Sequence, residues 1–109
     1  MKIQDFIKQT FKIEHGYCFR PVIKCNDGFT MSVQGSSGHY CKPRKTQDFY
    51  ESLEIGFPNE KEDLILQYAE KEDFPTETVY GWVPIEVIQQ VIDKHGGIDV
   101  DKTFAESSI

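Results

Sequence analysis

The chain has 109 residues, a length that suits one ordinary domain with a single core. Hydrophobic residues make up 39% of it and aromatic residues 13%, which is enough apolar surface to offset the entropy of ordering, so wholesale disorder is excluded. There is no run of about 18 apolar residues, and the N-terminus mixes charged with apolar positions. We therefore expect neither a membrane span nor a secretory signal, and we expect a cytoplasmic location.

The charges are unevenly distributed. The net charge is −6, but residues 1–47 hold eight Lys/Arg and three Asp/Glu, a balance of +5, whereas residues 48–109 hold four and fifteen, a balance of −11. General nucleic-acid binding relies on many Lys and Arg side chains that neutralise phosphates, so the acidic half argues against it. The charge distribution is compatible with binding of a small anionic ligand near the basic half. The three cysteines form an odd set and predict reduced thiols without a structural disulfide.

The N-terminal residues predict a helix that packs on a core. Its apolar positions recur at helical spacing, and Gly16 after His15 is a plausible stop. These apolar positions are Ile3, Phe6, Ile7 and Phe11.

A hairpin follows, with strands at 19–25 and 29–34. A three-residue loop ending in Gly28 places Ile23 opposite Met31 and separates the faces, and glycine supplies the positive φ that such a loop requires. The core face is then Phe19, Ile23, Cys25, Phe29, Met31 and Val33. The outer, basic face is Arg20, Val22, Lys24, Thr30, Ser32 and Gln34, with Gln34 near Arg20.

The remainder predicts a loop, three strands and a second helix. Residues 35–47 are rich in Gly and Ser and form the loop, and β-like runs occupy 50–57, 64–68 and 78–83. Pro84 begins a helix that ends before Gly96-Gly97. The predicted fold class is α+β: an antiparallel meander sheet of four or five strands with an N-terminal and a C-terminal helix packed on one face. Residues 1–97 form the single domain, and 98–109 form a C-terminal tail.

The loop at 35–45 and the adjacent sheet face form the candidate ligand site. Hydroxyl, imidazole, aromatic and cationic groups gather there within a short span, although the Gly-Ser-Ser-Gly segment lacks the spacing of a P-loop. Guanidinium groups recognise phosphates and aromatic rings stack on bases, so a nucleotide-like ligand is chemically reasonable. The alternative is a solvated loop whose basic residues pair with the acidic half. The predicted ligand-binding residues are Arg20, Lys24, Ser32, Gln34, Ser36, Ser37, His39, Tyr40 and Arg44.

Metal and catalytic patterns are incomplete. His15 with Cys18 and His39 with Cys41 are spaced as ligand pairs, but nothing completes a zinc motif, so we expect no metal and no other cofactor. Cys41 or Ser37 with His39 as base lacks a third, orienting group, so an enzyme is less favoured than a binding protein. The aromatic segment 80–84 favours core packing, with an interface as the alternative.

Five segments are distinctive in combination: Phe29–Gln34, His39–Arg44, Glu54–Pro58, Val79–Pro84 and His95–Gly97. Together they resemble a family of small uncharacterised proteins encoded by bacteriophages and prophages, and the resemblance covers most of the chain. The family carries no established activity, so the resemblance transfers no catalytic residue. It implies a setting, a short accessory gene of a phage, in which takeover of the host and evasion of host defence are common roles.

Three functions follow from these observations. The leading one is an anti-defence binding protein, expected to be a homo-oligomer, that sequesters a nucleotide-type immune signal through the 35–45 loop and its basic neighbours. The second is an acidic protein–protein inhibitor that docks on a basic surface of a host defence protein. The third is a small hydrolase.

Overall fold

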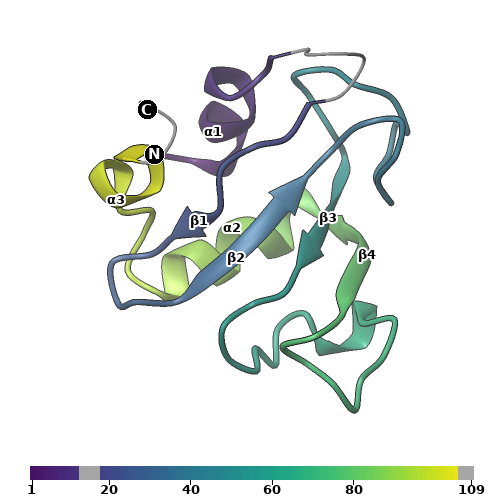
Figure 1. Cartoon of the computed structure of the whole chain (residues 1–109), viewed down its shortest axis with the longest axis vertical. Coiled ribbons are helices and arrows are strands. Elements are labelled where there is room, and N and C mark those ends of the chain that lie inside the picture. The colour runs from purple at the N-terminus through teal and green to yellow at the C-terminus, as the bar shows by residue number, and fades with distance from the viewer. Residues whose placement is uncertain (13–17, 106–109) are drawn as a thin grey trace.

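The structure, a computed structural model, describes residues 1–12 and 18–105. Within these residues the chain forms a four-stranded antiparallel sheet in the order β1-β2-β3-β4 (Figure 1). The strands are β1 (Ile23–Lys24), β2 (Thr30–Gln34), β3 (Ser52–Gly56) and β4 (Val79–Pro84). Each strand pairs with its neighbour in sequence, so the predicted α+β meander is confirmed.

The hairpin register is also confirmed. Ile23 pairs with Met31, and the Cys25 N–H donates to the carbonyl of Phe29 at 2.8 Å. Gly28 has φ +96°, a conformation that residues with a Cβ rarely adopt. The alternation of side chains on this hairpin therefore follows from its loop chemistry and its apolar pattern together.

The predicted alternation fails before β1. Phe19, expected in the core, is 73% exposed, whereas Arg20, expected on the open face, is only 4% exposed. The strand begins at Ile23, and Pro21 has no N–H to donate to a ladder, so residues 19–22 do not follow the two-residue period.

Two helices cover one face of the sheet. Helix α2 (Ile85–Lys94) crosses behind the strands, and α1 (Ile3–Gln9) lies beside it (Figure 1). Helix α2 ends as predicted, because Gly96 and Gly97 both have positive φ. Phe11 lies beyond the end of α1 and is partly exposed, and the expected stop at Gly16 lies outside the described residues.

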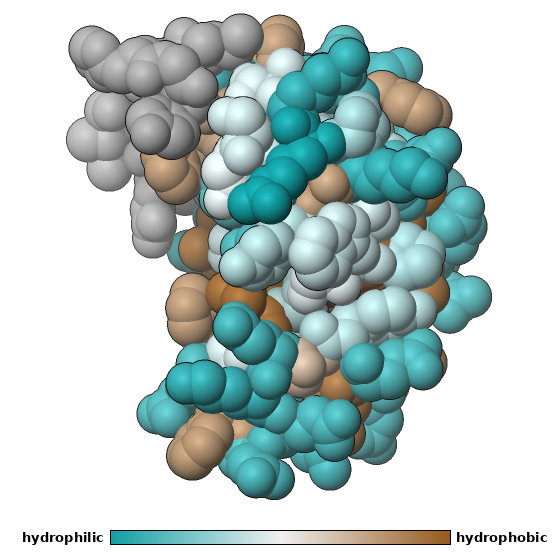
Figure 2. Space-filling view, turned by 90° about the vertical axis from the view of Figure 1, so that its right-hand side faces the viewer, coloured by the Kyte–Doolittle hydropathy of each residue, from teal (hydrophilic) through white to brown (hydrophobic). Residues whose placement is uncertain are grey.

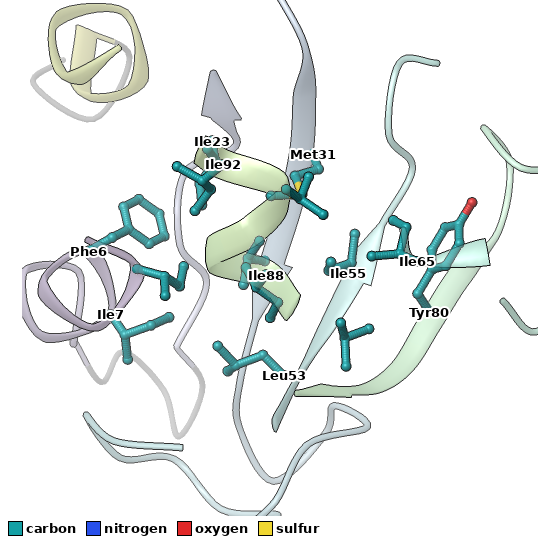
Figure 3. Packing of buried hydrophobic residues seen from close by; sticks show 14 of the residues in the cluster. Phe6, Ile7, Ile23, Met31, Leu53, Ile55, Ile65, Tyr80, Ile88 and Ile92 are labelled. Atoms are coloured by element: carbon teal, nitrogen blue, oxygen red, sulfur yellow. The ribbon is translucent and has the colours of Figure 1, made fainter. Parts of the chain in front are cut away.

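The core fills the space between helices and sheet. Ile88 and Ile92 of α2 lie between Phe6 of α1 and the sheet (Figure 3). From the sheet, Ile23, Met31, Leu53, Ile55 and Tyr80 complete this layer (Figure 3). The burial of these side chains supplies the main driving force for the fold.

The segment between β3 and β4 differs from its prediction. Residues 64–68, expected as a strand, form turns and the 3₁₀ helix η1 (Leu66–Tyr68), because a short apolar run does not by itself distinguish strand from helix. Ala69 then bridges to Tyr80, and the Glu70 N–H donates to the carbonyl of Val79 at 2.9 Å. These contacts cover part of the outer edge of β4, where unpaired backbone groups would otherwise lie.

Residues 98–105, expected as the first part of a tail, pack on the opposite edge of the sheet. Ile98 bridges to Cys25, and helix α3 (Val100–Ala105) follows. The Asp99 carboxylate accepts the Lys102 N–H at 3.0 Å, which is the contact of an N-cap that the weak apolar periodicity concealed. None of the described helices combines the length and apolarity that a membrane crossing requires.

Candidate functional site

The loop after β2 is folded around the buried side chain of Ser36. The Ser36 Oγ lies 2.6 Å from His39 Nδ1 and accepts the Gly38 N–H at 3.0 Å. The Ser36 carbonyl accepts the His39 N–H at 3.3 Å and the Cys41 thiol, also at 3.3 Å. The Gly/Ser segment is therefore a tight turn held by its own hydrogen bonds.

Arg20 ties the two ends of this loop together from inside. Its Nη1 donates to the carbonyl of Gly35 at 2.8 Å, and its Nη2 donates to the carbonyl of Gln47 at 3.1 Å. Gln34, 9% exposed, accepts the Arg20 N–H and donates to the Arg20 carbonyl, both at 2.8 Å. The predicted proximity of Arg20 and Gln34 is confirmed. The prediction that both residues lie on an open polar face is wrong. The Arg20 guanidinium is buried because the carbonyls of Gly35 and Gln47 accept its hydrogen bonds in the interior.

Two other predicted site residues lie elsewhere on the sheet. Lys24 is in the edge strand β1, where its N–H donates to Thr103 Oγ1 of α3 at 3.0 Å. Ser32 lies in β2, and its hydroxyl oxygen accepts a hydrogen bond from Gln34 Nε2 at 3.0 Å. The structure therefore separates Lys24 from the 35–45 loop, which lies toward the β4 side (Figure 1).

The accessible part of the site is an aromatic cluster of Tyr40, Arg44 and Trp82, hereafter the aromatic platform. The rings of Tyr40 and Trp82 lie 5.0 Å apart, and their residues are 37% and 52% exposed. The Arg44 guanidinium carbon lies 5.3 Å from the centroid of the Tyr40 ring, within cation–π range. Ser37 is exposed in the same loop and His39 is partly buried there.

A β-bulge directs Trp82 outward. Leu53 pairs with Val83 and Ile55 with Tyr80, so Gly81 and Trp82 together oppose Glu54 alone. Trp82 has φ +50°, an uncommon conformation for a bulky residue. Bulges and strained backbone of this kind concentrate at functional sites, where they re-aim a side chain. The sequence favoured core packing for the aromatic segment 80–84, with an interface as the alternative, and did not place Trp82 beside the 35–45 loop.

The 35–45 loop contacts the bulge through its backbone. The Trp82 N–H donates to the Tyr40 carbonyl at 3.0 Å, and the Tyr40 N–H donates to Glu54 Oε2 at 2.8 Å. Because both residues of the ring pair are held by backbone hydrogen bonds, the aromatic platform is largely preorganised.

A groove of about 330 Å³ adjoins the aromatic platform. Its lining residues are Tyr40, Tyr68, Glu70, Val79, Gly81 and Trp82. Figure 2 shows the side of the molecule on which β4 lies: side chains of intermediate hydropathy gather in the middle, between strongly hydrophilic ones above and below. Such a surface offers ring faces to a ligand without a deep apolar cavity.

The titratable groups of the loop are poorly suited to nucleophilic catalysis. Burial raises the pKa of the Cys41 thiol, and its Sγ is engaged by the carbonyls of Ser36 and Pro43, so it is not a thiolate near neutral pH. Burial lowers the pKa of His39, which keeps its imidazole neutral. The Ser36 hydroxyl is fully buried and out of reach of a substrate.

A second polar cluster lies at the other end of the sheet. His95 Nδ1 lies 2.6 Å from Asp27 Oδ2, and His95 Nε2 lies 2.7 Å from Glu62 Oε1. Lys94 Nζ donates to Glu62 Oε2 at 2.9 Å, and the His95 ring stacks on Phe29 at 4.0 Å. Since both ring nitrogens are already hydrogen-bonded, this cluster joins the hairpin turn, the 62–64 turn and the end of α2, and it offers a ligand no free nitrogen.

In the described part of the chain, no group of three or more His, Cys, Asp or Glu side chains could hold a metal ion. His15, one of the possible ligands considered from the sequence, lies outside the described residues.

The fold and site define an α+β protein that presents an exposed surface of aromatic rings and an arginine beside strand β4. No protein-family model, curated protein or solved structure matches the chain.

Proposed function

We propose that this protein is a binding protein that captures a nucleotide-type ligand on the aromatic platform. The observation that carries the proposal is the Arg44 guanidinium 5.3 Å from the Tyr40 ring centroid, with the Trp82 ring 5.0 Å from that of Tyr40. A base would stack on the exposed Trp82 ring, and a phosphate would accept hydrogen bonds from Arg44.

The neighbouring groups suit an anion at this end of the platform. Lys45 is exposed one residue after Arg44, and Ser37 presents an exposed hydroxyl in the same loop. Lys42 is also exposed but lies 3.3 Å from Glu51, so part of its charge is already balanced. The proposed ligand contacts therefore centre on Arg44, with weaker support from the other two.

Capture without turnover fits the chemistry of the loop, in which the Cys41 thiol, the Ser36 hydroxyl and the His39 imidazole are all hydrogen-bonded or buried. Together with the resemblance to phage-encoded proteins, this supports the more specific proposal of an anti-defence factor. It would act in the cytoplasm of the host cell and lower the free concentration of a nucleotide-type immune signal. The homo-oligomeric state expected from the sequence remains a prediction, and native mass spectrometry of protein from infected cells would test it.

Calorimetric titration with linear and cyclic adenine and guanine nucleotides tests the proposal. Arg44→Ala removes the guanidinium from the platform, and Lys45→Ala removes an exposed charge beside it. We expect Arg44→Ala to weaken binding by about tenfold or more, as for loss of a charge-assisted contact, and Lys45→Ala to change it by less than about threefold. If no nucleotide in the panel binds the wild-type protein, or if the two variants weaken binding equally, the proposal is wrong.

A second candidate, an inhibitor that docks on a basic host protein, is favoured by the acidic connector before β4, residues 70–77. Its carboxylates are exposed, and Phe74 among them is 55% exposed. Aromatic residues within a charged rim are typical of interface hot spots. Two variants distinguish the candidates. Charge reversal at Glu72 and Asp73 would abolish salt-sensitive association with the host protein and leave nucleotide affinity unchanged. Arg44→Ala would weaken nucleotide binding and leave the association with the host protein unchanged.

A further inference from the structure

The groove beside the aromatic platform differs in charge from the platform itself. Three aromatic residues, Tyr40, Tyr68 and Trp82, and one acidic residue, Glu70, are among those that line it. Among the residues that the structure describes, the lining contains no basic side chain, and no Lys, Arg or His forms an ion pair with Glu70. We propose that this groove binds an organic cation of the alkylated ammonium type.

The chemistry of the lining supports a cation. Aromatic faces carry the negative part of the ring quadrupole, and several rings around one position attract ammonium groups, more strongly when the groups are weakly hydrated. A carboxylate at the rim adds a full opposite charge. The chain already places one cation on this surface, because the Arg44 guanidinium carbon lies 5.3 Å from the centroid of the Tyr40 ring.

The groove is also held in shape. The Glu70 N–H donates to the Val79 carbonyl at 2.9 Å, and the Trp82 N–H donates to the Tyr40 carbonyl at 3.0 Å. Gly81 packs against Tyr40, because an added Cβ would lie 3.4 Å from Tyr40 Cβ. The volume of about 330 Å³ is at the lower end of the range of ligand pockets, which suits a small headgroup.

The cation would not compete with the proposed nucleotide for charged groups. Arg44 does not line the groove, whereas Glu70, from the segment between η1 and β4, does. Glu70→Gln is therefore the variant that should lose cation binding, and Glu72→Gln, which removes an exposed carboxylate outside the groove, is its matched control. This inference does not depend on the proposed function, because each ligand is tested with its own variant.

Fluorescence provides a direct readout, since Trp82 is the single tryptophan of the chain. Choline is titrated into the full-length protein, with sodium chloride at matched ionic strength and with the neutral isostere of choline in which carbon replaces nitrogen. We expect saturable quenching by choline, at least about tenfold weaker binding of the isostere, and no saturable effect of sodium chloride. Equal binding of choline and its isostere, or no saturation by choline, would overturn the proposal.

The variants test the assignment of the carboxylate. Glu70→Gln should weaken choline binding several-fold, whereas Glu72→Gln, which removes an exposed carboxylate in the same connector, should leave it within about twofold. Circular dichroism confirms that each variant is folded. A peptide containing trimethyllysine distinguishes the source of the cation: tighter binding than choline indicates a protein segment, and weaker binding indicates a small molecule. If Glu70→Gln binds choline as wild type does, the assignment is wrong.

Discussion

Tyr40 and Trp82 are joined twice: the Trp82 N–H donates to the Tyr40 carbonyl at 3.0 Å, and the two rings lie 5.0 Å apart. One residue belongs to the loop after β2 and the other to the bulge in β4. The backbone contact fixes the loop against the sheet edge, and the ring contact creates the exposed surface. The proposed functions therefore depend on an arrangement that stability experiments can probe independently of any ligand.

The backbone at Trp82 is expected to be strained. Trp82→Ala and Trp82→Gly both remove the ring, but only alanine keeps a Cβ at φ +50°. Because the left-handed region costs residues with a Cβ roughly 1–2 kcal/mol, Trp82→Gly should be more stable than Trp82→Ala by about 1 kcal/mol. Urea unfolding followed by circular dichroism measures the difference. If the alanine variant is as stable as the glycine variant, the left-handed backbone is not retained in solution.

Two glycines of the 35–45 loop should respond very differently to alanine. A Cβ on Gly35 would lie 2.7 Å from Leu53 Cδ2 and 2.7 Å from Tyr50 Cζ, whereas the nearest atom to a Cβ on Gly38 is Ser36 Oγ at 3.7 Å. Gly35→Ala should therefore cost about 1–3 kcal/mol through overpacking. Gly38→Ala should stay within about 0.5 kcal/mol. Thermal and urea unfolding of both variants checks this, and equal stability would contradict the close packing of Gly35.

Arg20 and Arg44 should divide between stability and binding. Arg20→Lys loses the planar fork that reaches the carbonyls of Gly35 and Gln47, so we expect a loss of about 1–3 kcal/mol in the free energy of unfolding. Arg44→Ala removes an exposed side chain and should change it by less than about 0.5 kcal/mol. The opposite result would be a destabilised Arg44→Ala variant and an Arg20→Lys variant as stable as the wild type. It would show that Arg20, rather than Arg44, is the exposed ligand contact.

His95 should make stability depend on pH. Burial alone would lower its pKa, but hydrogen bonds to the carboxylates of Glu62 and Asp27 outweigh burial and raise the pKa above its usual value. The stabilisation from protonated His95 is thus complete below the unfolded pKa of about 6.5, and it is lost as pH rises through the higher folded pKa. Urea unfolding from acidic to mildly alkaline pH should show this loss in the wild-type protein.

The carboxylates of the same cluster act at lower pH. Hydrogen bonds from the backbone N–H of Phe29 and from the His95 ring lower the pKa of Asp27. Burial alone would raise the pKa of Glu62, but hydrogen bonds with the Leu64 N–H, Lys94 and His95 outweigh burial and lower this pKa. Their stabilisation is present above the unfolded pKa of about 4 and is lost as pH falls. His39, whose pKa burial lowers, also loses stabilisation as pH falls. His95→Gln is the control: if its stability falls above neutral pH as steeply as that of the wild type, His95 is not the group responsible.

The meander, the hairpin register and the end of α2 could be predicted from the sequence, because each depends on local chemistry. Alternation with Gly28 sets Ile23 opposite Met31, and Gly96-Gly97 ends the helix. Two other features depend on contacts between distant segments, which local patterns do not encode: the carbonyls of Gly35 and Gln47 bind Arg20 in the interior, and a bulge brings Trp82 to Tyr40. Alternation predicts which face a side chain takes only inside a paired strand, and neither Arg20 nor the bulged Trp82 occupies a regular ladder position.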